Sequence, residues 1–318
     1  MQRRDLLALG AAGAGTLALG AHAEDYDDPD RMYEALGALP KLRLTPAGGE
    51  IDVIFAPEVP AAQRPVIVNW IALSAAALVQ YFGQFSVKHV GLLIVSGEGR
   101  RVGHGTAFGH AGSAIRVTVG REAEHAAFLA DWVLVHEMVH LAFPTLQRRH
   151  LWIEEGSATY VEPVARVQAG QLSAASVWQQ FQRGMPQGLP RAGDEGFDNT
   201  HTWGRTYWGG AMFCLLADID ILRRTQLRLG LREALNAIRI ASGGNSARWS
   251  IERALQVGDE AVGVPVLSEQ YRNMGAQPVS PDLEALFAQL GVPEQGEAFD
   301  DNAPLAAVRR AIMKPRAV

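Results

Sequence analysis

The residues best suited to chemistry are His136-Glu137-Met138-Val139-His140, an H-E-x-x-H sequence. Residues four apart lie on one face of a helix, so both imidazoles can reach a single ion. Zinc accepts nitrogen ligands at about 2.0–2.1 Å and keeps one position open for water in catalytic sites. Glu137 lies on the flank of such a site, where it can take a proton from that water. The spacing predicts one zinc ion per chain, with His136 and His140 as ligands.

The segment around this motif is apolar on nearly every side, which is typical of a buried helix. Its apolar residues are Trp132, Val133, Leu134, Val135, Met138, Val139, Leu141 and Phe143. Burying two histidines and a glutamate among them is costly unless they have partners, and a zinc ion is a natural partner. With nine histidines in 318 residues, a chance match has odds of only roughly one or two in a hundred.

A third ligand is expected downstream, in residues 152–162, which read WIEEGSATYVE. Its two carboxylates Glu154 and Glu155 are adjacent, so only one of them can face the ion. Glu162 lies seven residues past Glu155 and returns to the same helical face.

The pair HEMVH and WIEEGSATYVE resembles the active-site signature of gluzincin metallopeptidases, particularly the aminopeptidase N and glycyl aminopeptidase families. Their second motif reads like W-L-N-E-G-F-A-T-Y-x-E. The resemblance makes Glu155 the zinc ligand and places Glu154 at the family's usual asparagine. It also implies that Glu162 orients a ligating histidine; the alternative is a solvated charge. Residues 141–154 are shorter than the usual connection, which predicts a trimmed loop at Pro144.

Residues 205–212, RTYWGGAM, are similar to the family's Y-x-K-G-x segment at the start of a long helix. The similarity implies that Tyr207 hydrogen-bonds the oxyanion of the reaction; the alternative is a packing aromatic. Gly209 stands where the family has lysine. The neighbours His201 and Arg205 could do the same work or hold a substrate carboxylate.

Exopeptidases of these families carry a glutamate, in a motif such as G-x-M-E-N, that binds the free amino terminus. The corresponding stretch, expected at residues 109–114, has no carboxylate. An unpaired ammonium is costly to desolvate, so we expect no strong preference for free amino termini. Asp194, Glu195 and Asp198 form the one group that could supply a substitute anchor.

The resemblance implies a zinc metallopeptidase acting on peptide or protein substrates. Two alternatives stay open: a zinc hydrolase of a non-peptide amide or ester, and an inactive exported metal-binding module. The intact Glu137 argues against the module, because a pure metal site needs no base. The endo or exo mode and the oligomeric state stay open.

These residues must be positioned by an α+β fold, which the resemblance implies is a thermolysin-like zincin. Periodicity predicts a small mixed sheet from strands at 50–55, 87–96, 101–108 and 113–119, with a backing helix at about 62–82. Asp131 is expected to cap a helix that runs to Phe143 and stops at Pro144. Further helices are expected at about 152–168, 173–184, 204–225, 230–242, 248–256 and 281–290, with a loop at 185–203.

The domain prediction is an N-terminal α/β lobe at 24–122, opening with a polar leader at 24–48, and a helical lobe at 123–318 that carries the zinc site. Residues 1–23 resemble a twin-arginine export signal, with Arg3-Arg4, a weakly apolar stretch and an A-x-A site at 21–23. They predict a periplasmic or secreted protein; an ordinary secretory signal and a retained anchor are the alternatives.

Composition bears on three further properties: nucleic acid binding, disulfide bonds and a membrane span. The net charge of −5 shows no basic surplus, so we expect no nucleic acid partner. A single cysteine, Cys214, excludes an internal disulfide. The apolar run at 66–82 contains Asn69 and Gln80, and we expect a buried helix on the sheet rather than a membrane span.

Overall fold

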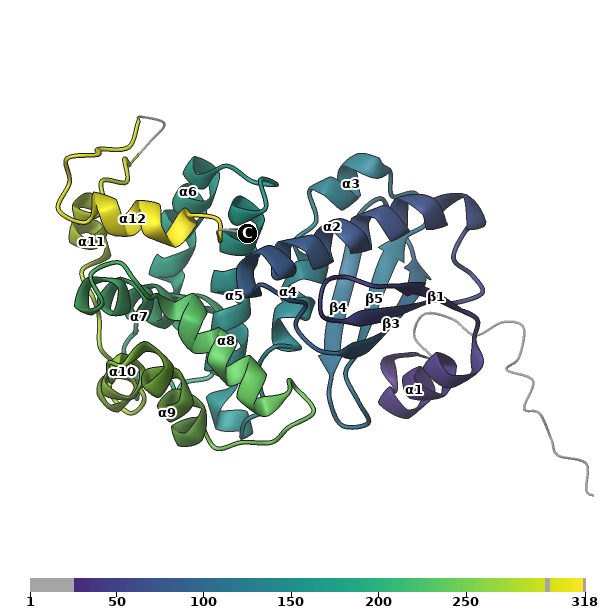
Figure 1. The fold of residues 1–318 in the computed structure, drawn as a ribbon, viewed down its shortest axis with the longest axis horizontal. Helices are drawn as coiled ribbons and strands as arrows, with labels where there is room; N and C mark the ends of the chain where they lie inside the picture. Colours follow the sequence, from purple (N-terminus) through teal and green to yellow (C-terminus); the bar gives the residue numbers. More distant parts are fainter. Residues whose placement is uncertain (1–25, 295–297, 317–318) are drawn as a thin grey trace, which may run out of the picture.

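A computed structural model describes residues 26–294 and 298–316 of the chain. The predicted export signal at 1–23 lies outside these residues. In the described part, all named strands lie between residues 41 and 120, and every named element after that is a helix or helical turn (Figure 1). The predicted α+β fold, a small mixed sheet with a mostly helical remainder, is confirmed.

The sheet has five strands in the order β1-β2-β3-β5-β4. These are β1 (Lys41–Leu44), β2 (Glu50–Phe55), β3 (His89–Gly97), β4 (Val102–Phe108) and β5 (Ala114–Gly120). The inner strands β2, β3 and β5 are parallel, and β1 and β4 are antiparallel edge strands. The apolar run in β3 is buried throughout, as expected of a parallel strand covered on both faces.

Helix α2 (Arg64–Phe82) runs along the sheet in Figure 1. Within the described residues, 61–82 is the one helical segment long and apolar enough to cross a membrane, and half of its apolar window is buried in the protein. Its buried side chains include Ile67, Trp70, Ile71 and Leu78. This burial is the arrangement expected of a core helix.

Helix α4 (Val133–His140) carries the H-E-x-x-H sequence. Asp131 caps it as predicted, because its carboxylate accepts from the backbone N–H of Val133 and Leu134 at 3.0 and 3.1 Å. The helix ends at His140, three residues earlier than predicted. Pro144 disfavours helical geometry in the residue before it, and the carbonyl of Leu141 instead accepts from Asn245 N.

The other helices are α3 (His125–Leu129), α5 (Leu151–Gln168), α6 (Ala174–Gly184), α7 (Gly210–Arg224), α8 (Leu231–Ser242), α9 (Ile251–Val262), α10 (Val266–Met274), α11 (Leu283–Gln289) and α12 (Ala306–Met313). The predicted helix at 204–225 begins with a π-helical turn, η5 (Arg205–Gly209), that leads directly into α7. The predicted loop at 185–203 holds only a short 3-10 turn, η4 (Met185–Gly188).

The prediction of a polar leader at 24–48 is wrong. Helix α1 (Pro29–Ala38) is capped by Asp28, whose carboxylate accepts from the N–H of Asp30 and Arg31, and the helix buries Met32 and Ala35. Strand β1 then pairs with β2. Helices α3, α10 and α12 were also not predicted, and α9 runs six residues past the predicted end at 256.

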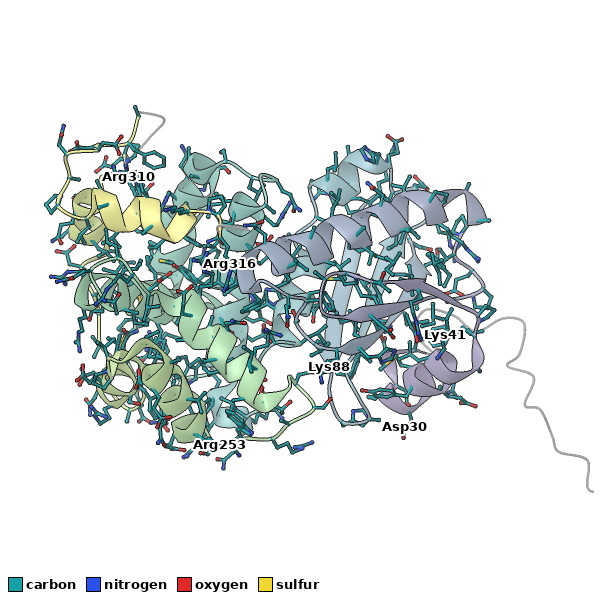
Figure 2. All side chains as sticks on the ribbon, viewed as in Figure 1. Asp30, Lys41, Lys88, Arg253, Arg310 and Arg316 are labelled. Atoms are coloured by element: carbon teal, nitrogen blue, oxygen red, sulfur yellow. The ribbon has the colours of Figure 1, made fainter. Side chains whose placement is uncertain are left out.

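The C-terminal end of the described chain folds back onto α2. Gln80 Nε2 donates to the carbonyl of Arg316 at 3.1 Å, and Arg316 Nη1 donates to the carbonyl of Phe82 at 3.4 Å. Figure 2 shows the Arg316 side chain beside the end of α2, where the sheet and the helical part adjoin. Residues more than 230 positions apart thereby hold the two parts together.

Candidate metal centre

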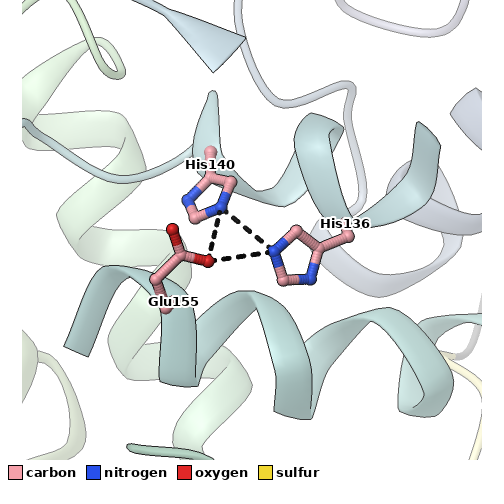
Figure 3. A group of neighbouring side chains, drawn as sticks. All are labelled: His136, His140 and Glu155. Atoms are coloured by element: carbon pink, nitrogen blue, oxygen red, sulfur yellow. Dashed lines mark hydrogen bonds and ion pairs between the residues drawn. The ribbon is translucent and has the colours of Figure 1, made fainter. Parts of the chain in front are cut away.

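Three side chains from two helices converge on one point. His136 and His140 extend from α4, and Glu155 extends from α5 (Figure 3). The two Nε2 atoms lie 3.2 Å apart, and Glu155 Oε2 lies 3.1 Å from Nε2 of His136 and 3.3 Å from Nε2 of His140. The structure thus brings together all three residues predicted as ligands.

The spacing of these three atoms fits a zinc ion. Ligands at about 2.0–2.1 Å from a tetrahedral zinc lie about 3.3 Å from one another, which matches the three distances. Two imidazole nitrogens that face each other can share only one proton, whereas a cation accepts both lone pairs and the carboxylate. The donor set of two imidazoles and one carboxylate is one that catalytic zinc sites use.

The charges at this point are strongly coupled. Burial lowers the pKa of His136. Burial also opposes the charged form of His140, but the hydrogen bond and negative charge of Glu155 raise the pKa of that imidazole to about 9. Burial likewise disfavours a charged Glu155, yet its bonds to the two histidines hold the pKa of the carboxyl well below its usual range. These shifts favour a negatively charged Glu155 at the point where the two imidazoles meet it.

A short connection joins α4 to α5 and lets α5 pack beside α4. The loop after His140 and the turn η3 (Arg148–His150) lead into α5. Glu154 is not among the three converging side chains. Its Oε1 accepts from the N–H of Leu146 at 3.1 Å, which fixes this loop. Of the two adjacent carboxylates, Glu155 is therefore the one that meets the histidines.

Glu137 lies beside the three ligand residues, with its side chain almost fully buried. Burial raises the pKa of this carboxyl above its usual value, and a backbone hydrogen bond from Ala107 partly offsets that effect. The close fit requires Gly105 on strand β4, because a Cβ there would lie 2.8 Å from Glu137 Cγ. The edge strand thus positions the predicted base.

Tyr207 lies beside Glu155, in the π-helical turn η5. Its ring stacks on that of His136 with centroids 6.2 Å apart, and on that of Trp203 at 5.7 Å. Burial and the negative charges of Glu155 and Glu137 raise the pKa of its phenol to about 12. The hydroxyl therefore stays protonated and can donate a hydrogen bond at neutral pH.

Two further residues named from the sequence have other partners. Glu162 is buried, and its Oε1 accepts from Arg166 Nη1 at 2.8 Å on the same helix. Among the described residues it makes no hydrogen bond to His136 or His140, so it fits neither of its two interpretations. The Arg205 side chain is buried, with its Nε 2.8 Å from Oδ2 of Asp194, and its Nη1 donates to the carbonyl of Gly188. It is not available for a substrate carboxylate.

A cavity of about 420 Å³ opens on the three ligand residues, and residues 103–107 of strand β4 form one wall of it. The expectation that residues 109–114 lie beside the site is therefore wrong: the wall comes from the strand before that turn. Its acidic lining residues within the described chain are Glu137, Glu154 and Glu155. Besides Glu137 and the converging Glu155, Glu154 is the one carboxylate among these lining residues, and its Oε1 already accepts from the N–H of Leu146.

The predicted substitute anchor is also absent from this cavity. Asp194 pairs with Arg205, and Asp198 accepts from His150, Trp152 and Tyr271. None of the three acids, nor His201, is among the lining residues in the described part of the chain.

Two tryptophans at the rim of the cavity were not predicted. Trp132 and Trp203 are 53% and 61% exposed, although large aromatic side chains are usually buried. Trp132 contacts His136 edge-on, with ring centroids 5.4 Å apart. Both tryptophans are close in sequence to site residues, but the sequence pattern gives no sign that Trp132 is exposed, because its neighbours form a buried helix.

The fold is similar to that of solved structures. An aminopeptidase N family protein from Idiomarina loihiensis matches with a TM-score of 0.59 and 12% sequence identity, over 79% of this chain and 49% of that one. An M1 zinc metallopeptidase from Deinococcus radiodurans matches with a TM-score of 0.46 and 13% identity, over 81% and 54%. A two-domain M1 zinc metallopeptidase variant bound to L-tryptophan gives 0.47 and 14%, over 76% and 53%.

These comparisons bear on the fold alone. The chain spans about half the length of the structures it matches, and the first match shows that it shares a fold with an aminopeptidase N family protein. No protein-family model matches the chain. No curated protein matches it either.

Proposed function

We propose that the protein is a zinc-dependent metallopeptidase that hydrolyses peptide bonds. The observation that carries the proposal is the convergence of His136, His140 and Glu155 on one point, with the buried Glu137 beside it. The fold shared with an aminopeptidase N family protein supports the same reaction class. A site used only to hold a metal has no need for a buried carboxylate in the position of a base.

His136, His140 and Glu155 would hold the zinc ion. When bound, zinc would polarise a substrate carbonyl and increase the acidity of water in the site. The protein contributes the shape of the site: the rings of Trp132 and Tyr207 flank His136 and fix its orientation. A fixed ligand geometry of this kind preserves an open position for substrate and water.

Glu137 moves the protons. As a carboxylate it takes a proton from the attacking water, and it then passes that proton to the amine that leaves. Burial raises the pKa of this carboxyl above its ordinary value, which makes the carboxylate a stronger base towards water. The backbone of strand β4 holds the carboxylate in place through the N–H of Ala107.

Tyr207 donates a hydrogen bond to the carbonyl oxygen as negative charge develops on it. The high pKa of its phenol keeps the proton on the hydroxyl. Gly209 occupies the position where the resembling families have lysine, so Tyr207 acts here without that neighbouring cation. Donors of this kind contribute mainly to the rate of the chemical step.

The wall of the cavity favours a peptide over another amide or ester. Strand β4 is at the edge of the sheet, and residues 103–107 line the cavity. An extended peptide can add to such an edge through main-chain hydrogen bonds, which a small ester cannot do. Within the described residues the one further carboxylate of this cavity, Glu154, is engaged by the N–H of Leu146. We therefore expect cleavage of peptides with blocked amino termini as well as free ones.

The test combines metal analysis with a peptide digest. The purified protein should contain one zinc per chain and cleave members of a mixed-sequence peptide library. Glu137→Gln should retain zinc and fold while turnover falls by about 10²–10⁴. Zinc-loaded wild type that cleaves no peptide but hydrolyses esters would support the alternative function, and full activity in Glu137→Gln would contradict the mechanism.

One peptide with a free and an acetylated amino terminus then separates exopeptidase from endopeptidase action. We expect rates within about threefold of each other, because an exposed ammonium without a buried partner contributes little to binding. A large preference for the free form would restore the aminopeptidase interpretation.

Export is proposed on the sequence of residues 1–23 alone. Fusing this segment to a reporter that needs prior folding should direct the reporter out of the cytoplasm, and Arg3→Lys with Arg4→Lys should retain it inside.

A further inference from the structure

A second cavity adjoins the one that holds the candidate metal centre. It has a volume of about 540 Å³ and lies between the segment at 187–194 and the segment at 200–205. Trp203 lines both cavities, so the two cavities meet at this residue. At 61% exposure, Trp203 leaves much of its surface available to a bound chain that passes from one cavity to the other.

The two cavities differ in charge. The acidic residues Glu137, Glu154 and Glu155 line the cavity at the metal centre, and among the described residues it has no lysine or arginine in its lining. The second cavity contains two arginines and one acid. Arg205 and Asp194 are both buried and paired at 2.8 Å, so their charges cancel.

Arg191 supplies the remaining charge. Its side chain is exposed and lines the second cavity. Within the described residues its guanidinium has no ion-pair or hydrogen-bond partner, whereas Arg205 has Asp194 and the carbonyl of Gly188. The second cavity therefore has one net positive charge that the protein leaves without a partner.

Two hydroxyls in the same cavity can assist this cation. Thr200 Oγ1 accepts from the N–H of Glu195 at 2.9 Å, and Thr202 Oγ1 accepts from the N–H of Arg205 at 3.3 Å. Because each oxygen accepts from the backbone, its own proton is free to be donated to a ligand. Together with a guanidinium, such donors are suited to a carboxylate.

We propose that the second cavity is a substrate subsite that binds a carboxylate, with Arg191 as its specificity-determining residue. The inference rests on the proposed peptidase function and adds the substrate class: peptides with a carboxylate on one side of the bond that is cleaved. The carboxylate is either the free carboxyl terminus or an aspartate or glutamate side chain. The peptide crosses Trp203, which contacts it between the two cavities.

The experiment uses one mixed-sequence pentapeptide library with acetylated amino termini, made with free carboxyl termini and again with carboxamides. A third set has carboxamide ends and one aspartate in each peptide. A fourth set is identical except that asparagine replaces this aspartate. Binding is measured by tryptophan fluorescence and calorimetry on the zinc-loaded Glu137→Gln chain, which does not need turnover. Cleavage is measured on the wild-type chain by mass spectrometry.

We expect the carboxylate forms to bind about three- to tenfold more tightly than their neutral counterparts, a ratio that falls with salt. Arg191→Gln should reduce the ratio to about one and leave binding of the neutral forms unchanged. Arg121→Gln is the matched control, because Arg121 is also exposed but lines neither cavity; it should retain the full ratio. The free-terminus and aspartate sets show which source of carboxylate is bound.

Equal binding of the charged and neutral forms, including no detectable binding of either, overturns the proposal, as does an unchanged ratio in Arg191→Gln. Cleavage of the carboxamide peptides with no charge preference would leave the peptidase function standing and remove the subsite. An Arg191-dependent preference in binding without any cleavage would retain the subsite and remove the peptidase function.

Discussion

At the scale of single residues, the candidate centre assigns different roles to two adjacent glutamates. Glu155 meets the two histidines, and Glu154 accepts from the N–H of Leu146 in the loop that joins the two helices. In the proposed site, Glu155 is a metal ligand and Glu154 fixes the path of the chain. Spacing alone shows two carboxylates in tandem and does not separate their roles, because the difference depends on the rotation of α5 relative to α4; the resemblance of the motif selected Glu155.

This division predicts opposite results for two neighbouring substitutions. Changing a residue that only supports a metal ligand lowers metal affinity by about 10–100-fold. Glu155→Ala removes a proposed ligand itself, so its zinc affinity should fall by more than that. Glu154→Gln should retain zinc, because an amide oxygen can still accept from Leu146 N. Elemental analysis after dialysis against a weak chelator measures both. Loss of zinc in Glu154→Gln together with retention in Glu155→Ala would reassign the ligand.

Tyr207 offers a second prediction at this scale. Tyr207→Phe should lower kcat by about 10²–10³ with little change in KM or zinc content, because the hydroxyl acts on the developing oxyanion. Tyr33→Phe is the control, since Tyr33 donates to the carbonyl of Gly112 and does not line the site cavity. Steady-state kinetics decide the matter, and unchanged kcat in Tyr207→Phe would make this residue a packing aromatic.

Most of the candidate site could be predicted from the sequence because its signals are local. The i, i+4 histidines and the intervening Glu137 occupy one helix, and Glu155 lies in a motif with a recognisable glycine. The walls of the site could not be predicted. Residues 103–107 enter it only through the pairing of β4 with β5, and Asp194 is removed from it by a buried partner.

At the scale of the elements, a pair of glycines sets the distance between two helices. One is α5, which carries Glu155, and the other is α7, which follows the turn that carries Tyr207. A Cβ on Gly156 of α5 would lie 2.3 Å from the backbone of Gly210 on α7, and a Cβ on Gly210 would lie 2.0 Å from the carbonyl oxygen of Trp152. Side chains at either position would separate α5 from α7. The close approach therefore places the turn η5, with Tyr207, beside Glu155.

Gly156→Ala should therefore destabilise the protein by about 1–3 kcal/mol, since backbone atoms cannot rotate away as side chains can. Activity should fall with it, because Tyr207 moves relative to Glu155. Gly37→Ala is the matched control: Gly37 lies in helix α1 with nothing within 4 Å of the added Cβ, so stability should rise slightly. Denaturant unfolding measures both, and an unaffected Gly156→Ala would show that α5 and α7 can separate without cost.

The elements themselves were predictable where the pattern of burial is visible along the chain. The strand at 50–55 and the helices at 152–168 and 173–184 are within a residue of β2, α5 and α6. Strand β1 was missed because three of its four residues are exposed, so it has no alternation to detect. It forms because β2 offers an edge for pairing, which is a property of the folded sheet and not of residues 41–44.

At the scale of the whole molecule, a buried acid joins three helices of the helical part. Asp218 on α7 accepts from the hydroxyl of Tyr160 on α5 at 2.7 Å and from the N–H of Leu231 at the start of α8 at 2.8 Å. Burial raises the pKa of this carboxyl to about 6, and the two hydrogen bonds only partly offset that rise. The network therefore carries a proton through much of the acidic pH range.

This gives a pH dependence of stability whose sign can be worked out. The folded pKa of about 6 lies above the ordinary value of 3.8, so between pH 4 and pH 6 the folded chain binds more protons than the unfolded chain. The contribution of Asp218 is then favourable at low pH and is lost as the pH rises towards 6, by something on the order of 3 kcal/mol in total.

Asp218→Asn removes this ionisation. Thermal unfolding at pH 4, 5, 6 and 7 should therefore show a smaller fall of Tm with pH in Asp218→Asn than in wild type, because other carboxyls contribute equally to both. Parallel curves for the two chains would mean that Asp218 is ionised in the folded protein throughout, and that the junction of α5, α7 and α8 is held by a charged hydrogen-bonded group.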